Sequence, residues 1–100
     1  MAQLLDGRNK KMAIMDDDGI VKDLKNIKIG RVSVNGEVFN TGGKKVGSFR
    51  ENGYIYDEDG KHIGTVRNDG GVYDYEVQRV GKVIGGNIKQ GGAALLLLVR

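Results

Sequence analysis

The chain has 100 residues, no cysteine, one histidine and a formal net charge of +3. This length fits one domain that buries roughly two thirds of the surface of its unfolded chain, and the lack of cysteine excludes a disulfide framework and a thiolate metal site. Because 13 acidic residues are interspersed among the 16 lysines and arginines, and no basic run carries stacking aromatics, the composition argues against nucleic-acid binding.

The sequence reveals no membrane-spanning or export segment at either end. Met1 to Leu5 is too short to hold the charged and apolar regions of a signal peptide. The longest apolar run, Ala93 to Val99, is far below the ~20 residues of a transmembrane helix. We therefore expect no transmembrane segment, and the compartment stays open between the cytoplasm and export with the signal removed.

Glycine recurs at an interval of 17 residues in two separate columns. Repetition at a fixed period indicates a short supersecondary unit whose copies bury one another's apolar faces. The chain therefore reads as one repeat domain over residues 1–100, with clear units at 19–35, 36–52, 53–69 and 70–86. The two columns are Gly19, Gly36, Gly53, Gly70 and Gly30, Gly47, Gly64, Gly81.

Each unit predicts a β-hairpin. Its first glycine follows Asp or Asn, and such dipeptides are typical of a two-residue hairpin turn with positive φ at both positions. Longer loops such as 41–45 and 58–62 would then connect the hairpins. In the phrase Ile29-Gly30-Arg31-Val32 the two apolar side chains lie three residues apart, so we expect the glycine to form a bulge that turns both toward one core.

The two ends read as degenerate copies, at 2–18 and 87–100. In this register Gln3 to Asp6 and Leu95 to Arg100 are strands that pair and close the ring, or that exchange between neighbouring chains and allow self-association. The predicted fold is all-β: 17-residue hairpins around a pseudo-rotational axis, closed by the N- and C-terminal strands. The alternative is a small up-and-down β-barrel.

Three phrases together resemble the bacterial β-flower proteins, a small family described as four-fold or five-fold. These are Gly-x-Val-Tyr-Asp, the recurring Ile-Gly-x-Val, and the tail from Gly91 to Leu98. The resemblance covers nearly the whole chain. It implies short hairpins arranged as petals about an axis, and it brings no established activity.

Four tyrosines form the candidate binding surface. The column of Phe39, Tyr56 and Tyr73 alternates with the apolar column and so lies on the opposite strand face. With Tyr54 and Tyr75 nearby, these rings either pack across strands or form a patch that contacts a protein or a glycan. The candidate residues are Tyr54, Tyr56, Tyr73 and Tyr75.

A polar column at Asp23, Asn40, Asp57 and Asp74 has two interpretations. Each side chain caps the loop that follows it, or a ring of oxygens holds a hard cation. His62 has no second imidazole to form a zinc site and is expected in a loop. We therefore predict no cofactor and a non-enzymatic scaffold or binding module, with a small ion-binding protein or enzyme that uses the carboxylates as the alternative.

Overall fold

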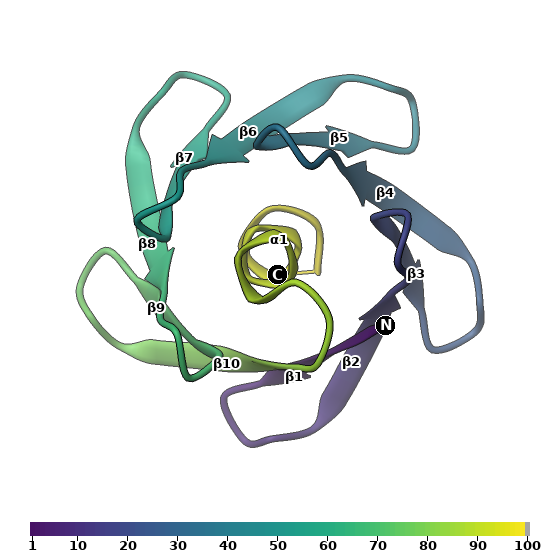
Figure 1. The fold of residues 1–100 in the computed structure, drawn as a ribbon, viewed down its shortest axis with the longest axis horizontal. Coiled ribbons are helices and arrows are strands. Elements are labelled where there is room, and N and C mark those ends of the chain that lie inside the picture. Colours follow the sequence, from purple (N-terminus) through teal and green to yellow (C-terminus); the bar gives the residue numbers. More distant parts are fainter. Residues whose placement is uncertain (100) are drawn as a thin grey trace.

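The computed structural model describes residues 1–99 as a closed barrel of ten antiparallel strands around a central helix (Figure 1). The helix is continuous, with α-helix α1 at Ile88–Ala94 followed by the π-helix η1 at Leu95–Val99. Neither helix is long and apolar enough to cross a membrane. The strands are β1 (Ala2–Asp6), β2 (Lys11–Met15), β3 (Ile20–Asp23), β4 (Lys28–Val32), β5 (Glu37–Asn40), β6 (Lys45–Phe49), β7 (Tyr54–Asp57), β8 (His62–Val66), β9 (Gly71–Asp74) and β10 (Arg79–Ile84).

Five hairpins project outward from the barrel as petals (Figure 1). We number them petal 1 (β1–β2), petal 2 (β3–β4), petal 3 (β5–β6), petal 4 (β7–β8) and petal 5 (β9–β10). Each strand also pairs with the adjacent strand of the next petal, and β1 pairs with β10 to close the ring. The all-β ring of hairpins is therefore confirmed, and because every strand pairs with its neighbours along the chain it is equally an up-and-down barrel.

Closure does not use the segment that the sequence suggested. The last strand of the ring is β10, whereas Leu95–Val99 is helical and lies inside the barrel. The prediction of a strand at 95–100 and of a sixth hairpin copy at 87–100 is therefore wrong for residues 87–99; Arg100 lies outside the described residues. Within the chain, β1 and β10 pair with each other, and self-association by exchange of a terminal strand between chains stays a prediction.

Two series of turns alternate around the ring, and both use the same three-residue loop. In the turn between petals 1 and 2, the amide of Gly19 donates to the carbonyl of Asp16, and the amide of Asp16 donates to the carbonyl of Ile20. Only Gly19, at φ +84°, has a positive φ there, so the predicted two-residue turn with two positive angles is wrong. The petals end instead at the second series, the tip loops at 24–26 and its equivalents, which the sequence had suggested were connections between hairpins.

The predicted bulge is present in the four petals that carry its glycine, and petal 1 has the same register shift at Leu4/Leu5, opposite Ala13. In petal 2, Val21 is opposite Gly30 while Lys22 is opposite Lys28, so Ile29 is the extra residue. Ile29 packs against the core together with its equivalents, and the glycine that follows it points inward. Registers shift in the same way at Val38/Phe39, Ile55/Tyr56 and Arg79/Gly81.

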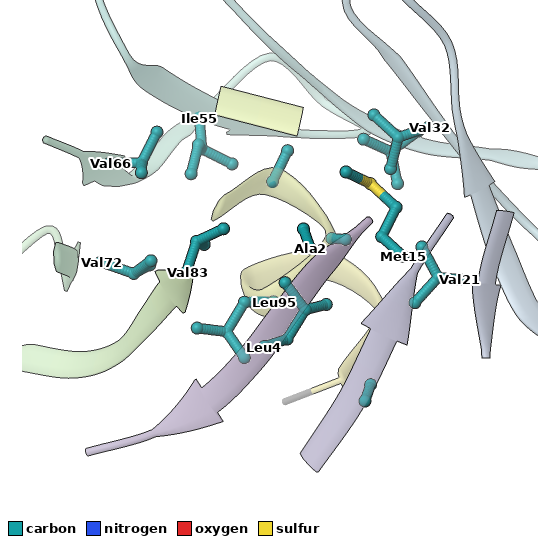
Figure 2. Packing of buried hydrophobic residues seen from close by; sticks show 14 residues of the cluster. Ala2, Leu4, Met15, Val21, Val32, Ile55, Val66, Val72, Val83 and Leu95 are labelled. Atoms are coloured by element: carbon teal, nitrogen blue, oxygen red, sulfur yellow. The ribbon is translucent and has the colours of Figure 1, made fainter. Parts of the chain in front are cut away.

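Small residues allow the helix to pass through the barrel. A Cβ on Gly91 would meet the side chain of Val83 at 2.6 Å, and a Cβ on Gly92 would meet that of Val66 at 2.5 Å. Figure 2 shows side chains from several strands converging on this helix. Because the molecule is only 19 Å thick, a helix of this length, at roughly 1.5 Å per residue, fills the whole axis.

The π-helix fits the ring residue by residue. A Cβ on any inward glycine would collide with one leucine of η1, and consecutive leucines meet consecutive petals. Five petals require one fifth of a turn per residue, about 72°, and i→i+5 hydrogen bonding brings a helix closer to this angle than the 100° of an α-helix. The four pairs are Leu95 with Gly81, Leu96 with Gly64, Leu97 with Gly47 and Leu98 with Gly30.

Candidate functional site

The outer surface of petal 4 gathers three of the aromatic side chains. The rings of Tyr54 and His62 are stacked, with centroids 4.6 Å apart and planes 13° apart. Tyr56 lies against the same imidazole at 5.7 Å. His62 is the first residue of β8, so its expected position in a loop is wrong. Register explains the contact, since His62 lies opposite Tyr56 in the ladder between β7 and β8.

Arginines cover the aromatic rings that lie between petals. Arg50 lies over Tyr56, with 5.2 Å from Cζ to the ring centroid, and Arg67 lies over Tyr73 at 4.4 Å. A guanidinium over an aromatic face is attractive by ~0.5–1 kcal/mol at an exposed site. The interpretation of Tyr56 and Tyr73 as packing residues is therefore supported, although both rings remain part of the outer surface.

The third ring of this column is covered from a different position. The repeat places Ser33 where the other units carry Arg50 and Arg67, and the serine side chain carries no positive charge. Arg31, directly opposite Phe39 in the ladder, covers that ring instead, with Cζ 4.7 Å from its centroid. Each ring of the column thus receives one arginine, which indicates that the pairing matters at each of the three places.

The four predicted tyrosines do not form one cluster. Tyr54, 42% exposed, and Tyr56 share petal 4 with His62. Tyr73 lies across from Thr65 of β8, so it adjoins petal 4. Tyr75 lies in the tip loop of petal 5, 64% exposed, and no ring contact joins it to the others within residues 1–99. We call Tyr54, Tyr56, His62 and Tyr73, with Arg50 and Arg67, the aromatic wall.

The polar column at the petal tips caps backbone amides. Oδ1 of Asp57 accepts from the amides of Asp59 and Lys61, each at 2.9 Å. The capping interpretation of this column is confirmed, because every petal repeats the pair of bonds. Within residues 1–99, no group of three His, Cys, Asp or Glu side chains is arranged to hold a metal ion. The capping residues are Asp6, Asp23, Asn40, Asp57 and Asp74.

One tip carboxylate shows how such bonds alter acidity. The amides of Lys10 and Arg8 donate to Asp6, and these two bonds lower the pKa of its carboxyl group below the ordinary value. Asp17 behaves similarly for another reason: the terminal ammonium of Met1 donates to it and lowers its pKa. Both carboxylates make these bonds at the solvent-exposed surface. Their lowered pKa values therefore reflect local hydrogen bonds and do not mark a buried catalytic group.

A second surface feature is a cavity of about 270 Å³ on the outside of the barrel, between β2 and β3. Apolar walls come from Ile14, Ile20 and Leu24, and Lys22 and Asp16 supply charge. The sequence had not pointed to this place. The available signal was a gap in the pattern, because Lys22 occupies the position in which the next three units carry Phe39, Tyr56 and Tyr73.

The comparisons with known proteins agree with this architecture. The sequence model of a family described as 5-fold beta-flower protein matches residues 1–99. No curated protein and no solved structure matches the chain at a significant level.

Proposed function

The chain belongs to the 5-fold beta-flower family, a β-repeat scaffold, and on that premise we propose that it is a non-enzymatic binding module whose aromatic wall docks a protein partner. The observation that carries the proposal is the composition of the wall. Tyrosine and arginine are enriched at the energetic centres of protein interfaces. Here four aromatic rings and two arginines lie together on the side of petals 4 and 5.

A protein fits this wall better than a glycan. Sugars stack on free aromatic faces, but Arg50 and Arg67 each cover a face of Tyr56 and Tyr73, and His62 covers a face of Tyr54. Each of these rings thus has one face already occupied, and the hydroxyl and guanidinium groups beside it suit hydrogen bonds to a polypeptide. Because Arg50 and Arg67 are cations, the partner is expected to present carboxylates.

The chemistry near the wall offers no support for catalysis. His62 Nε2 lies 3.3 Å from Thr65 Oγ1, which places a hydroxyl beside a base. A nucleophile–base pair of this kind also needs a group that orients the base, and within residues 1–99 no carboxylate bonds to His62. The alternative function, ion binding or catalysis by the tip carboxylates, gains nothing from the geometry, since their Oδ1 atoms already cap the loops.

Site-specific cross-linking tests the proposal. A photoreactive phenylalanine at Tyr54 is expected to capture a defined partner, whereas the same residue at Val34, 90% exposed on the turn between petals 2 and 3, is not. The captured protein is then purified and its affinity measured. Tyr54→Ala and Arg67→Ala are expected to weaken binding by more than about tenfold, a loss of ~1.4 kcal/mol, and Val34→Ala to leave it unchanged.

Salt dependence provides a second readout. If carboxylates of the partner face Arg50 and Arg67, affinity must fall as ionic strength rises, and Arg67→Ala must reduce that dependence. Equal capture at Tyr54 and Val34 would exclude the aromatic wall as the docking surface. An affinity that is unchanged in Tyr54→Ala and Arg67→Ala would exclude it as well.

A further inference from the structure

The cavity between β2 and β3 exists because one copy of the repeat lacks the groups that fill the same space elsewhere. Between petals 3 and 4 this outer groove contains the ring of Tyr56 under Arg50. At the equivalent positions between petals 1 and 2 the chain carries Lys22 and Asp16, and both line the cavity. The scaffold around it is otherwise the same, since β2 and β3 pair in the same antiparallel manner as β6 and β7. The unfilled space therefore lies where the groove between petals 3 and 4 holds an aromatic ring.

The walls of the cavity include apolar side chains that lie outside the hydrophobic core. Ile14 and Ile20 point outward from their strands and are half-buried. Leu24, 55% exposed, contributes from the adjacent tip, and Ile27 of the same tip is 57% exposed. The position of Ile27 holds Lys44, Lys61 or Gln78 in petals 3 to 5, and that of Leu24 holds Thr41, Glu58 or Tyr75. The tip of petal 5 also exposes Tyr75 and Val77, but the tip with Leu24 adjoins the cavity, and its apolar side chains there indicate a ligand with an apolar body.

The one charged group of the cavity that lacks a partner is Lys22. Oδ1 of Asp16 accepts from the amides of Asp18 and Ile20, and Oδ1 of Asp23 accepts from those of Lys25 and Ile27. Lys22, by contrast, makes no ion pair within residues 1–99. Lys22 is half-buried as a residue, lines the cavity and lies directly opposite Ile14 in the ladder. A carboxylate that pairs with an ammonium in such a partly buried place gains more than in open solvent.

We propose that this cavity binds a small aromatic carboxylate, with the ring in the space that Tyr56 fills at the equivalent groove and the carboxylate on Lys22. The size is adequate: a cavity of about 150 Å³ holds benzene, and the present one measures about 270 Å³. The site is separate from the aromatic wall, which lies on β7 to β9, so failure of either idea leaves the other untouched.

Benzoate is the probe and benzamide its uncharged control. In a ¹⁵N–¹H correlation experiment on the full chain, benzoate is expected to shift the amides of Ile14, Ile20 and Lys22 with a Kd in the millimolar range. Benzamide has the same ring and is expected to shift the same amides with about fivefold weaker affinity, the upper range for a half-exposed ion pair.

Two variants separate the ring from the charge. Lys22→Gln keeps the cavity and removes the ammonium, so benzoate and benzamide should bind it equally. Asp16→Arg with Lys22→Tyr reproduces the Arg50 and Tyr56 pair of petal 4, so it should fill the groove, keep the thermal midpoint at or above that of the parent and abolish both shifts. This double variant copies a pair that the same scaffold already contains, and its thermal midpoint distinguishes a filled groove from failed folding.

Three results would overturn the proposal. The first is the absence of benzoate-dependent shifts around Ile14, Ile20 and Lys22. The second is equal affinity of the parent chain for benzoate and benzamide, which would remove the role of Lys22. The third is undiminished binding to the filled double variant, which would place the ligand elsewhere.

Discussion

The match between η1 and the glycine column is open to a direct energetic test. A methyl group added at Gly30 would lie 2.6 Å and 2.7 Å from the two Cδ atoms of Leu98 and 2.6 Å from the carbonyl oxygen of Phe39. Carbon atoms in contact prefer about 3.5–4.0 Å, so the leucine must retreat by roughly 1 Å in a filled barrel. Overpacking of this kind costs ~1–3 kcal/mol, and we expect Gly30→Ala to destabilise the fold by about 2 kcal/mol.

The chain itself suggests the compensating change. Petal 1 has Ala13 in place of the glycine. If the progression of the four leucine–glycine pairs continues by one step, Val99, which is one methylene shorter than leucine, faces that petal. Leu98→Val alone should cost about 1 kcal/mol through lost burial. If the two changes acted independently the double variant would lose about 3 kcal/mol. Because the valine removes the two side-chain contacts but leaves the one with the carbonyl oxygen of Phe39, we expect a loss of about 2 kcal/mol, a coupling of about 1 kcal/mol.

Urea unfolding followed by far-ultraviolet circular dichroism measures these quantities, and in a chain of this size each kcal/mol also moves the thermal midpoint by ~4–8 °C. Gly42→Ala is the matched control: Gly42 has no positive φ, and its added methyl would meet only Asn40 Oδ1, at 3.4 Å. If the double variant loses the sum of the two single-variant losses to within about 0.5 kcal/mol, the two residues are not coupled and the proposed contact is refuted.

Three further predictions concern the tip loops. Val77 has φ +66° and is 64% exposed, and the other petals carry Asn9, Asn26, Gly43 and Gly60 at this position. Val77→Gly should therefore remove backbone strain without loss of packing and stabilise the fold by ~1 kcal/mol in urea unfolding; a destabilisation would contradict this. Asp57→Ala should cost ~1–2 kcal/mol because two capped amides lose their acceptor, whereas Asp57→Asn should be nearly neutral, as Asn40 makes the same two bonds; equal losses from both would show that charge and not capping matters. For Asp6 the folded pKa lies below the ordinary value of 3.8, so the stability it contributes is present above about pH 4 and is lost as pH falls through the folded pKa. Asp6→Asn should therefore flatten the dependence of unfolding midpoint on pH below 4, and an unchanged acid limb would count against it.

Much of the ring was predictable because each petal is specified locally. The glycine period, the apolar columns and the caps at Asp23 and Asp57 are properties of single units, and the structure keeps them in the predicted register. The exact turn geometry was not predictable from the dipeptides alone. Asp-Gly is compatible with a two-residue turn, but the amide bonds to Asp16 select the three-residue loop.

The central helix was missed for a different reason. A run such as Leu95 to Leu98 is apolar in every direction, so its pattern does not distinguish a strand buried on both faces from a helix buried all round. Gly91 and Gly92, which are poor helix formers, argued further against a helix. Only the assembled ring supplies the answer, because its axis is narrow enough near Val66 and Val83 that a helix must have glycine there. A local signal did exist in Asn87, whose Oδ1 caps the amide of Gln90.

The candidate sites were predictable to the extent that they are positions in a column. The outward face of Tyr56 and Tyr73 followed from strand alternation, whereas their arginine partners lie six residues earlier, across a turn, and no periodic rule connects them. The cavity could be recognised in the sequence only after the structure was known. The structure shows that an aromatic ring fills this position in other units, and Lys22 is the residue that replaces the ring in the column of Tyr56.

The number of petals and the length of the π-helix are linked by geometry. Each inward glycine leaves room for one side chain at the axis, and each residue of η1 turns by about one petal, so a complete plug needs as many residues as there are petals. A ring with one petal fewer would have a narrower axis and would ask for a larger turn per residue, closer to that of an α-helix. The length of the run Leu95–Val99 and the number of hairpins are therefore linked. The ring encloses five successive apolar residues and keeps them from water in a helical conformation. The helix in turn fills the space that ten short strands would otherwise leave empty.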